Sequence, residues 1–164
     1  MIARWNSGMI SPDLFEFLES GVSILVGSRS DRLLPECCRG LGARVEEEGR
    51  GITVFLPVAT TEQTVSNLRD NGRIAVCFSR AGDHRSMQIK GQVISIQEAN
   101  EADRAVIQRY RHSLAESWGV IGVPSRITLR MAHWPCHSVR LRVDSVFNQT
   151  PGPGAGAAMG AANR

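Results

Sequence analysis

Runs of apolar residues, some of them alternating with polar residues, recur along the chain and are separated by turn-forming residues. Such runs are typical of β-strands, in which successive side chains point to opposite faces. They predict six strands, at about residues 22–28, 37–47, 51–57, 73–80, 86–96 and 139–147. In the last strand we expect five residues on one face, namely Val139, Leu141, Val143, Ser145 and Phe147.

Two short helices are predicted mainly from the residues at their ends. Pro12 is favoured at a first helical position, and Gly21 is expected to end that helix after an apolar stretch. A second helix is predicted over residues 60–71, because Thr60 and Gln63 have the spacing of a capping box. Both helices should lie outside the run of strands.

A longer helix is predicted after Asn100. Asn100 is a favoured N-cap residue, and Asp103 stands at the third helical position. The apolar residues of this helix recur at helical spacing, at Val106, Ile107, Tyr110 and Leu114. The connection from this helix to the last strand has no clear pattern.

Six strands with mostly short connections predict a mainly β fold with peripheral α-helices. The arrangement that leaves fewest exposed strand edges is a closed or nearly closed antiparallel barrel of six strands with flanking helices. We expect this barrel domain over residues 1–150 and a Gly/Pro/Ala-rich C-terminal tail over residues 151–164.

The tail allows two interpretations. Its composition, NQTPGPGAGAAMGAANR, is typical of a disordered end. However, it follows the last strand directly, and Pro151 and Pro153 reduce the freedom that ordering must overcome. On the second interpretation, residues 148–156 are ordered against the barrel or a partner subunit near a ligand site, and residues 157–164 are mobile.

Composition and charge narrow the classes of function. The net charge of +3 is dispersed along the chain, which argues against a nucleic-acid partner. No apolar run is long enough to span a bilayer, and the N-terminus has no secretory pattern, so we expect a soluble cytoplasmic protein without a membrane partner. The four cysteines have no disulfide or zinc spacing and are expected to be reduced, with Cys37 and Cys38 on opposite faces of a strand.

The segment DHRSMQIKGQV, residues 83–93, is the most informative for chemistry. On a strand, Ser86, Gln88 and Lys90 project to one side while Met87 and Ile89 project to the other. This polar stripe is either a solvated outer face of the barrel or a surface that presents side chains to a ligand. In the second case the planar guanidinium of Arg85 suits phosphate oxygens.

The order of several motifs carries a family resemblance. The hairpin VEEEGRGITVFLP is followed by TTEQTVSNLRDNG, RIAVCFSR and HRSMQIKGQV. This order resembles the pyridoxamine 5'-phosphate oxidase-like family of FMN-binding split barrels, over roughly residues 20–150. The resemblance implies a six-stranded antiparallel split β-barrel with flanking helices. It also implies a homodimer that holds FMN between its subunits and functions as a flavin-dependent oxidoreductase. It identifies no catalytic side chain.

The resemblance also implies a set of cofactor-binding residues. The phosphate is met by side chains of the second strand, the start of the short helix and the strand after CFSR. By position these are Arg39, Arg44, Thr60, Thr61, Thr64, Arg85, Ser86 and Gln88. Many members have a lysine where this chain has Thr64, so one phosphate-binding cation is missing.

An alternative function remains open on the sequence. A dimeric barrel that has lost FMN binding could bind haem or another nucleotide-like ligand without redox turnover. His133, Cys136 and His137 offer nitrogen and sulfur donors, but no second pair completes a tetrahedral metal site, so we expect no metal.

Overall fold

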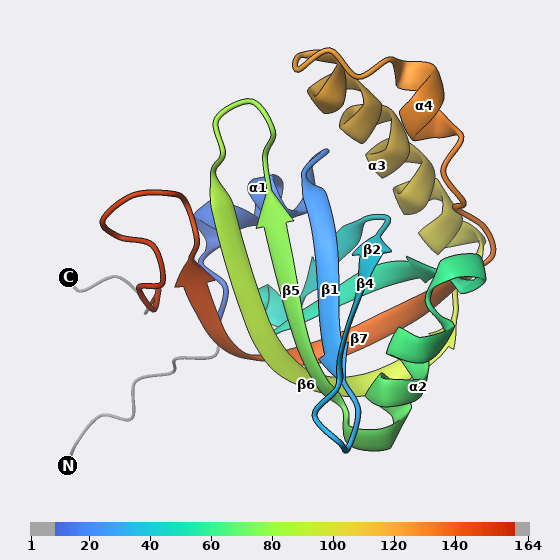
Figure 1. The fold of residues 1–164 in the computed structure, drawn as a ribbon, viewed down its shortest axis with the longest axis vertical. Coiled ribbons are helices and arrows are strands. Elements are labelled where there is room, and N and C mark those ends of the chain that lie inside the picture. The colour runs from blue at the N-terminus through green and yellow to red at the C-terminus, as the bar shows by residue number, and fades with distance from the viewer. Residues whose placement is uncertain (1–8, 160–164) are drawn as a thin grey trace.

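The computed structural model describes residues 9–159 and has the mainly β split-barrel fold with flanking helices (Figure 1). One antiparallel sheet has the strand order β2-β1-β5-β6-β7-β4-β3. The strands are β1 (Ser23–Arg29), β2 (Pro35–Gly40), β3 (Ala43–Glu46), β4 (Gly51–Pro57), β5 (Arg73–Ser79), β6 (Ser86–Glu98) and β7 (Cys136–Asn148). No helix among these residues is long and apolar enough to cross a membrane.

The sheet has seven strands rather than the predicted six because one predicted strand bends in the middle. The segment expected at residues 37–47 is divided into β2 and β3 at Leu41 and Gly42, and Gly42 has a φ of 120° that favours glycine. At this bend the Leu41 amide donates to the Phe55 carbonyl (2.8 Å) and the Phe55 amide donates to the Gly42 carbonyl (3.1 Å). These bonds connect the end of β2 to β4 and help to close the barrel.

The helices lie around this barrel. They are η1 (Pro12–Leu14), α1 (Phe15–Glu19), η2 (Glu47–Gly49), η3 (Val58–Thr60), α2 (Glu62–Asn71), α3 (Glu101–Gly119) and α4 (Ser125–Leu129). The capping box of Asn100 and Asp103 is present. The one predicted at Thr60 and Gln63 is wrong, because α2 begins after Thr61, whose hydroxyl donates to the Pro57 carbonyl (2.7 Å). Helix α4 lies in the connection that had no clear pattern.

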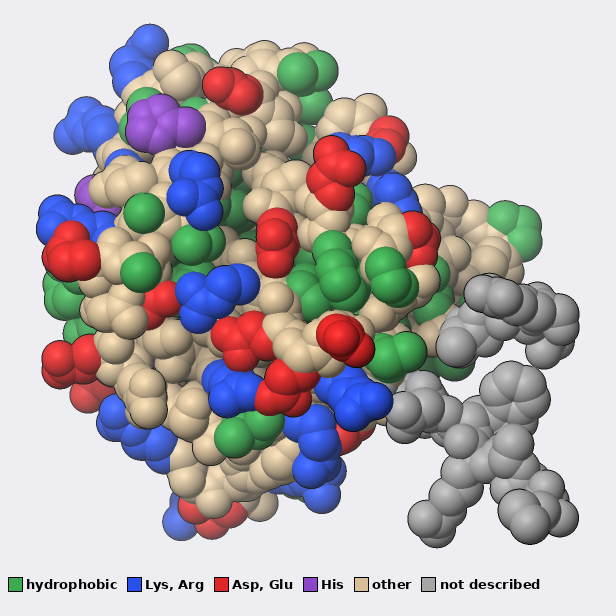
Figure 2. All heavy atoms as spheres, turned by 180° about the vertical axis from the view of Figure 1, so that it is seen from behind, with side chains coloured by type: hydrophobic (Ala, Val, Ile, Leu, Met, Phe, Trp, Pro, Cys, Tyr) green, Lys and Arg blue, Asp and Glu red, His purple; other side chains and the backbone are tan. Residues whose placement is uncertain are grey.

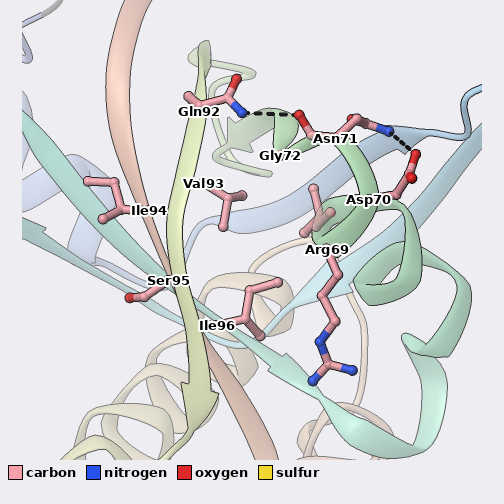
Figure 3. Close-up of a pocket in the computed structure, with 10 residues that line it drawn as sticks. Arg69, Asp70, Asn71, Gly72, Gln92, Val93, Ile94, Ser95 and Ile96 are labelled. Atoms are coloured by element: carbon pink, nitrogen blue, oxygen red, sulfur yellow. Dashed lines mark hydrogen bonds between the residues drawn. The ribbon is translucent and has the colours of Figure 1, made fainter.

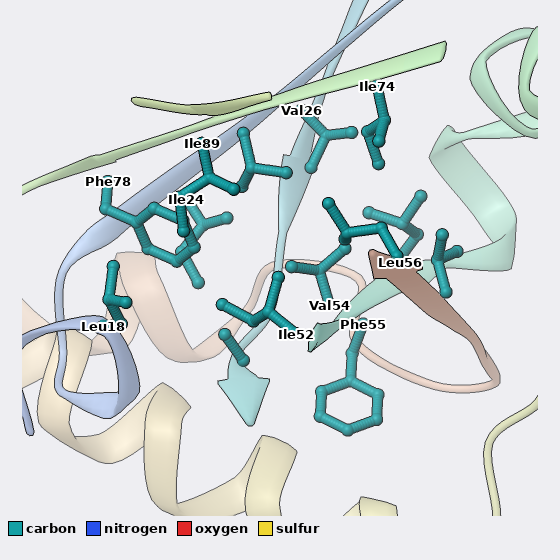
Figure 4. Packing of buried hydrophobic residues seen from close by; sticks show 14 of the residues in the cluster. Leu18, Ile24, Val26, Ile52, Val54, Phe55, Leu56, Ile74, Phe78 and Ile89 are labelled. Carbon is teal, nitrogen blue, oxygen red and sulfur yellow. The ribbon is translucent and has the colours of Figure 1, made fainter. Parts of the chain in front are cut away.

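The core fills the inside of the barrel. Ile24, Val26, Phe78 and Ile89 point from one wall toward the side chains of β4 on the other wall (Figure 4). Strand β4 is buried on both faces, because Phe55 points away from the barrel interior (Figure 4) and α3 covers that side of the strand. Helix α1 lies at one end of the barrel and α2 at the other (Figure 1).

The alternation along β7 changes phase near its end. Val139, Leu141 and Val143 are buried as predicted, but the prediction is wrong for Ser145 and Phe147. The β6–β7 register shifts at Asp144, so the inward residue that follows is Val146, which is 2% exposed. The sequence pattern gave no sign of this bulge, and Ser145 and Phe147 therefore lie on the outer side of the sheet.

The first part of the tail folds back onto the barrel. The Asn148 amide donates to the Ala157 carbonyl (2.9 Å), and the Met159 amide donates to the Val146 carbonyl (2.8 Å). Residues 148–156 are therefore ordered, as the second interpretation expects. The prediction of mobility from residue 157 is wrong for residues 157–159, and residues 160–164 lie outside the described part. The place of the tail near a ligand remains a prediction.

Candidate functional site

The strands β2, β1, β5, β6 and β7 share an outer face, which in Figure 1 is turned toward the viewer at β1, β5 and β6 with no helix in front of them. The strand register places side chains of this face in rows. In one row Arg39 lies opposite Leu25, Leu25 opposite Cys77, Cys77 opposite Gln88, and Gln88 opposite Phe147. The outer face therefore brings Arg39 and Gln88 of the predicted site together.

Small residues make the centre of this face shallow. Gly27 lies opposite Ala75, and Cys77 lies two residues further along β5. A Cβ atom built on Gly27 would meet only the Ala75 carbonyl oxygen, at 3.8 Å, among the described residues. Packing within this chain therefore does not require a glycine at position 27. A glycine in a strand often marks a place where a ligand or another backbone approaches closely.

Arg39 lies where the outer face meets the loop before β7. Its Nη1 donates to the Ser23 hydroxyl (2.9 Å), and its guanidinium carbon lies 5.0 Å from the centre of the Trp118 ring. A pocket of about 310 Å³ opens beside it, lined by Arg39, Leu41, Pro57, Thr60, Met131 and Ala132. Because a guanidinium has five N–H donors, Arg39 keeps donors that can face this pocket.

Of the three predicted threonines, one lines this pocket. Thr60 is exposed there, whereas Thr61 and Thr64 are 2% and 1% exposed. The Thr64 hydroxyl has no hydrogen-bond partner of ordinary geometry in the described residues, although it lies near Cys38. Thr61 and Thr64 thus serve the packing of α2 and do not present their hydroxyls to the outer face.

Ser86 and Gln88 lie at the start of β6. The Ser86 and Ser79 hydroxyls are 2.9 Å apart, and the Gln88 amide donates to the Cys77 sulfur at 3.4 Å. The tail holds this end of the strand, because the Ser86 amide donates to the Thr150 hydroxyl (3.0 Å). Gln88 is half-buried and keeps one amide donor and its carbonyl for a ligand.

Arg85 belongs to a different part of the molecule. Its guanidinium carbon lies 4.8 Å from the centre of the Phe17 ring, and that of Arg80 lies 5.5 Å from the same ring. Arg80 also pairs with Asp83 at 2.5 Å and holds the pKa of that carboxyl at about 2. This cluster is at the α1 end of the barrel, so the structure does not bring Arg85 together with the start of α2 (Figure 1).

Arg44 is committed to ion pairs. Its guanidinium lies 2.9 Å from an Asp103 oxygen and 3.3 Å from a Glu46 oxygen, on strand β3 at the far end of the sheet order. Arg44 therefore stabilises the contact of β3 with α3 and does not reach the outer face.

Acidic and basic side chains are interspersed over the face of the molecule opposite to that of Figure 1, as Figure 2 shows.

His133, Cys136 and His137 do not form a metal site. Cys136 is 1% exposed, its sulfur lies 3.1 Å from the His133 carbonyl oxygen, and burial raises the pKa of its thiol to about 12. Burial lowers the pKa of His137, and the positive charge of Arg69 lowers it further. Within residues 9–159, no group of three or more His, Cys, Asp or Glu side chains is placed to hold a metal ion.

A second pocket, of about 440 Å³, lies between the end of α2 and the second half of β6 (Figure 3). The Gln92 amide on its wall donates to the Asn71 carbonyl (3.0 Å), and the Asn71 amide reaches Asp70 at 3.4 Å. These side chains mainly complete the C-terminal end of the helix. No residue of the predicted site lines this pocket.

Comparison with known proteins identifies the fold. No protein-family model and no curated protein sequence matches the chain. Three solved structures match along most of their length: HupZ of Group A Streptococcus (19% identity, TM-score 0.56, 90% of this chain and 100% of that one), an F420 reductase (14%, 0.56, 82% and 97%) and a candidate pyridoxamine 5'-phosphate oxidase from Lactobacillus delbrueckii (9%, 0.55, 87% and 96%). The chain thus has the split-barrel fold of the pyridoxamine 5'-phosphate oxidase-like proteins.

Several residues of the outer face were missed by the sequence reasoning. Cys77 and Gly27 lie in the centre of the face. Trp118, at the end of α3, and Met131, in the loop before β7, border Arg39. Only Gly27 carried a signal in the sequence, as a glycine inside an apolar strand pattern. The positions of the others depend on strand register and on where α3 packs.

Proposed function

We propose that the chain binds FMN on the outer face, between two copies of itself, and functions as a flavin-dependent oxidoreductase. The observation that carries the proposal is the row from Arg39 through Leu25 and Cys77 to Gln88. It combines a guanidinium at one end, a shallow apolar centre and an amide at the other end. Three strand spacings, about 14 Å, separate the two ends, a length comparable to that of a flavin mononucleotide.

The chain's own residues fit an FMN molecule in part. Arg39 and Thr60 would meet the phosphate in the pocket of about 310 Å³, which has room for that group. Leu25 and Cys77 would pack against a flat ring, and the Gln88 amide would bind its polar edge. The first amides of α2 add a partial positive charge near Thr60, which replaces in part the family lysine that is missing at Thr64.

When bound, a flavin accepts and donates the electrons, and the protein supplies binding and orientation. Leu25 is 41% exposed on this open face, and no helix covers its strand there (Figure 1). A second copy of the chain would cover it and would exclude water from the ring. Homodimer formation and cofactor binding are therefore parts of the same proposal.

Titration with FMN tests the proposal directly. Quenching of flavin fluorescence should give saturable binding to the wild-type chain. Arg39→Gln should weaken that binding, whereas Arg126→Gln, an exposed arginine on α4 outside the face, should not. A chain that does not quench flavin fluorescence at any concentration would contradict the proposal.

A further inference from the structure

A hollow of about 580 Å³ lies on the outer face beside the row that runs from Arg39 to Gln88. Its floor is formed by Gly27 and Ala75, which face each other across β1 and β5. The remaining lining residues come from β1, β5, β6 and β7 and include Arg29, Arg73, Lys90 and Asp144. The hollow exists because its floor residues have no side chain or only a methyl group.

Three basic side chains surround this floor. Arg29 follows Gly27 by two residues on β1, and Arg73 precedes Ala75 by two residues on the adjacent strand β5. Both line the hollow just beyond the last paired residues of these strands. Lys90 lies opposite Ala75 on the next strand, β6. Like charges on neighbouring strands repel each other, so this arrangement costs stability unless an anion lies between them.

None of these three cations has a carboxylate partner within the described residues. Arg29 donates to the Ser30 carbonyl (3.0 Å), and the Lys90 ammonium lies 5.1 Å from the centre of the Phe147 ring. The one carboxylate in the wall, Asp144, is paired with Arg142 at 3.1 Å. On the opposite face of the molecule, acidic and basic side chains are interspersed (Figure 2), whereas these three cations have no carboxylate partner in the part of the chain that the structure describes.

We infer that the hollow is a binding site for a phosphate-bearing anion, held by Arg29, Arg73 and Lys90. Two arginines and a lysine from three adjacent strands offer both planar and point-charge donors to phosphate oxygens. The glycine floor lets a ligand lie against the backbone, and its volume exceeds that of a phosphate alone. The ligand is therefore a molecule with one charged end and a further group over Gly27 and Ala75.

The inference does not rest on the proposed function, because anion binding at Arg29, Arg73 and Lys90 needs no flavin. If a flavin lies on the row from Arg39 to Gln88, the hollow over Gly27 lies beside its ring.

The test uses inorganic pyrophosphate as the probe and the full chain without added FMN. In a ¹H–¹⁵N spectrum, pyrophosphate should shift the amide signals of Gly27, Ala75 and Lys90. Arg73→Gln and Lys90→Gln should each weaken this binding about tenfold, the effect of losing one hydrogen bond to a charged group. Arg126→Gln is the matched control and should bind as the wild type does.

A second variant fills the hollow without removing a charge. Gly27→Leu should abolish pyrophosphate binding and leave the chain folded, because a Cβ at this position meets only ordinary contact distances. Weakening of FMN and pyrophosphate to the same extent by Arg73→Gln would overturn the inference, since the hollow would then hold the phosphate of the cofactor. The inference would also be overturned if Arg126→Gln lost pyrophosphate binding to the same extent as Arg73→Gln. A wild-type dimer that binds no pyrophosphate and that dissociates when Gly27 is changed to leucine would overturn it as well.

Discussion

Arg39 and Trp118 are stacked, with the guanidinium carbon 5.0 Å from the centre of the indole ring. The two residues are far apart in sequence, since Arg39 is on β2 and Trp118 is at the end of α3. Their contact fixes the direction of Arg39, the one predicted phosphate-binding cation that lies on the outer face. Ser23 holds the same guanidinium from the neighbouring strand at 2.9 Å. The cation is thus oriented before any ligand binds.

The first prediction compares this cation with Arg85. Arg39→Ala should weaken FMN binding by about 1.5–3 kcal/mol, because it removes hydrogen bonds to a charged phosphate. Arg85→Ala should change it by less than about 0.5 kcal/mol, because Arg85 stacks on Phe17 at the α1 end. Fluorescence titration of both variants measures the difference. The reverse order of effects would place the phosphate at the start of β6.

The second prediction concerns the subunit interface. Leu25→Glu should shift the protein from dimer to monomer, because it places a charge in the centre of the apolar contact. Ile127→Glu is the control, since Ile127 is 55% exposed on α4, away from the outer face. Sedimentation equilibrium at micromolar concentration distinguishes the two. A wild-type chain that sediments only as an 18 kDa species would contradict the dimer.

Most strands and the start of α3 could be predicted, because the sequence patterns that indicate them are local. Alternating runs gave the strands, and Asn100 with Asp103 gave the start of α3 through a capping box that is present in the structure. The bend at Gly42 and the bulge at Asp144 were missed, because each depends on pairing with a strand that is distant in sequence. Helix α4 was missed because its five residues have too short a pattern.

The candidate site was less predictable for a related reason. Position along a strand does not say which side chains meet across it, so Arg39, Arg44 and Arg85 were equivalent in the sequence. In the structure Arg39 lines an open pocket, whereas Asp103 pairs with Arg44 and Phe17 contacts Arg85. Register and the packing of α3 decide which arginine faces a ligand, and neither can be deduced from local patterns.

The third prediction compares two glycines of the sheet. Gly91→Ala should lower the free energy of unfolding by about 1–3 kcal/mol, because overpacking at a bulge forces the backbone to shift. The added Cβ would lie 2.1 Å from the Arg142 carbonyl oxygen. Gly27→Ala should cost little, since its Cβ would lie 3.8 Å from the Ala75 carbonyl oxygen, which is an ordinary contact distance. Urea denaturation of both variants measures the contrast, and equal stabilities would show that the bulge can relax.

The fourth prediction concerns the tail. In hydrogen exchange, the amides of Asn148, Gln149 and Met159 should be protected, because they donate to Ala157, Ser86 and Val146 respectively. Removing residues 157–164 should expose the Asn148 amide and leave the Gln149 amide protected. Thr150→Ala should also loosen the start of β6, since its hydroxyl accepts from the Ser86 amide. Rapid exchange at Asn148 and Met159 in the intact chain would restore the interpretation of a disordered end.

The last prediction uses the cysteines as reporters of the outer face. Burial raises the pKa of Cys38 to about 11 and that of Cys136 to about 12, so both should remain thiols and resist alkylation by iodoacetamide at pH 8. Because both pKa values are raised, their reactivity should increase only as the pH rises toward these values. Cys37 is exposed and should react first, and half-buried Cys77 should follow.

Cys77 lies between Leu25 and Gln88 in the row proposed to carry the flavin ring. Saturating FMN should therefore slow the alkylation of Cys77 strongly, while Cys37, in the next row, should be protected less. Arg39→Ala at the same FMN concentration should lose this protection, which peptide mass spectrometry of the labelled chain can follow. A constant protein concentration keeps the dimer fraction equal between samples. Equal labelling of Cys77 with and without FMN would show that the ring binds elsewhere, because no flat ligand can cover Leu25 and Gln88 and leave the thiol between them open.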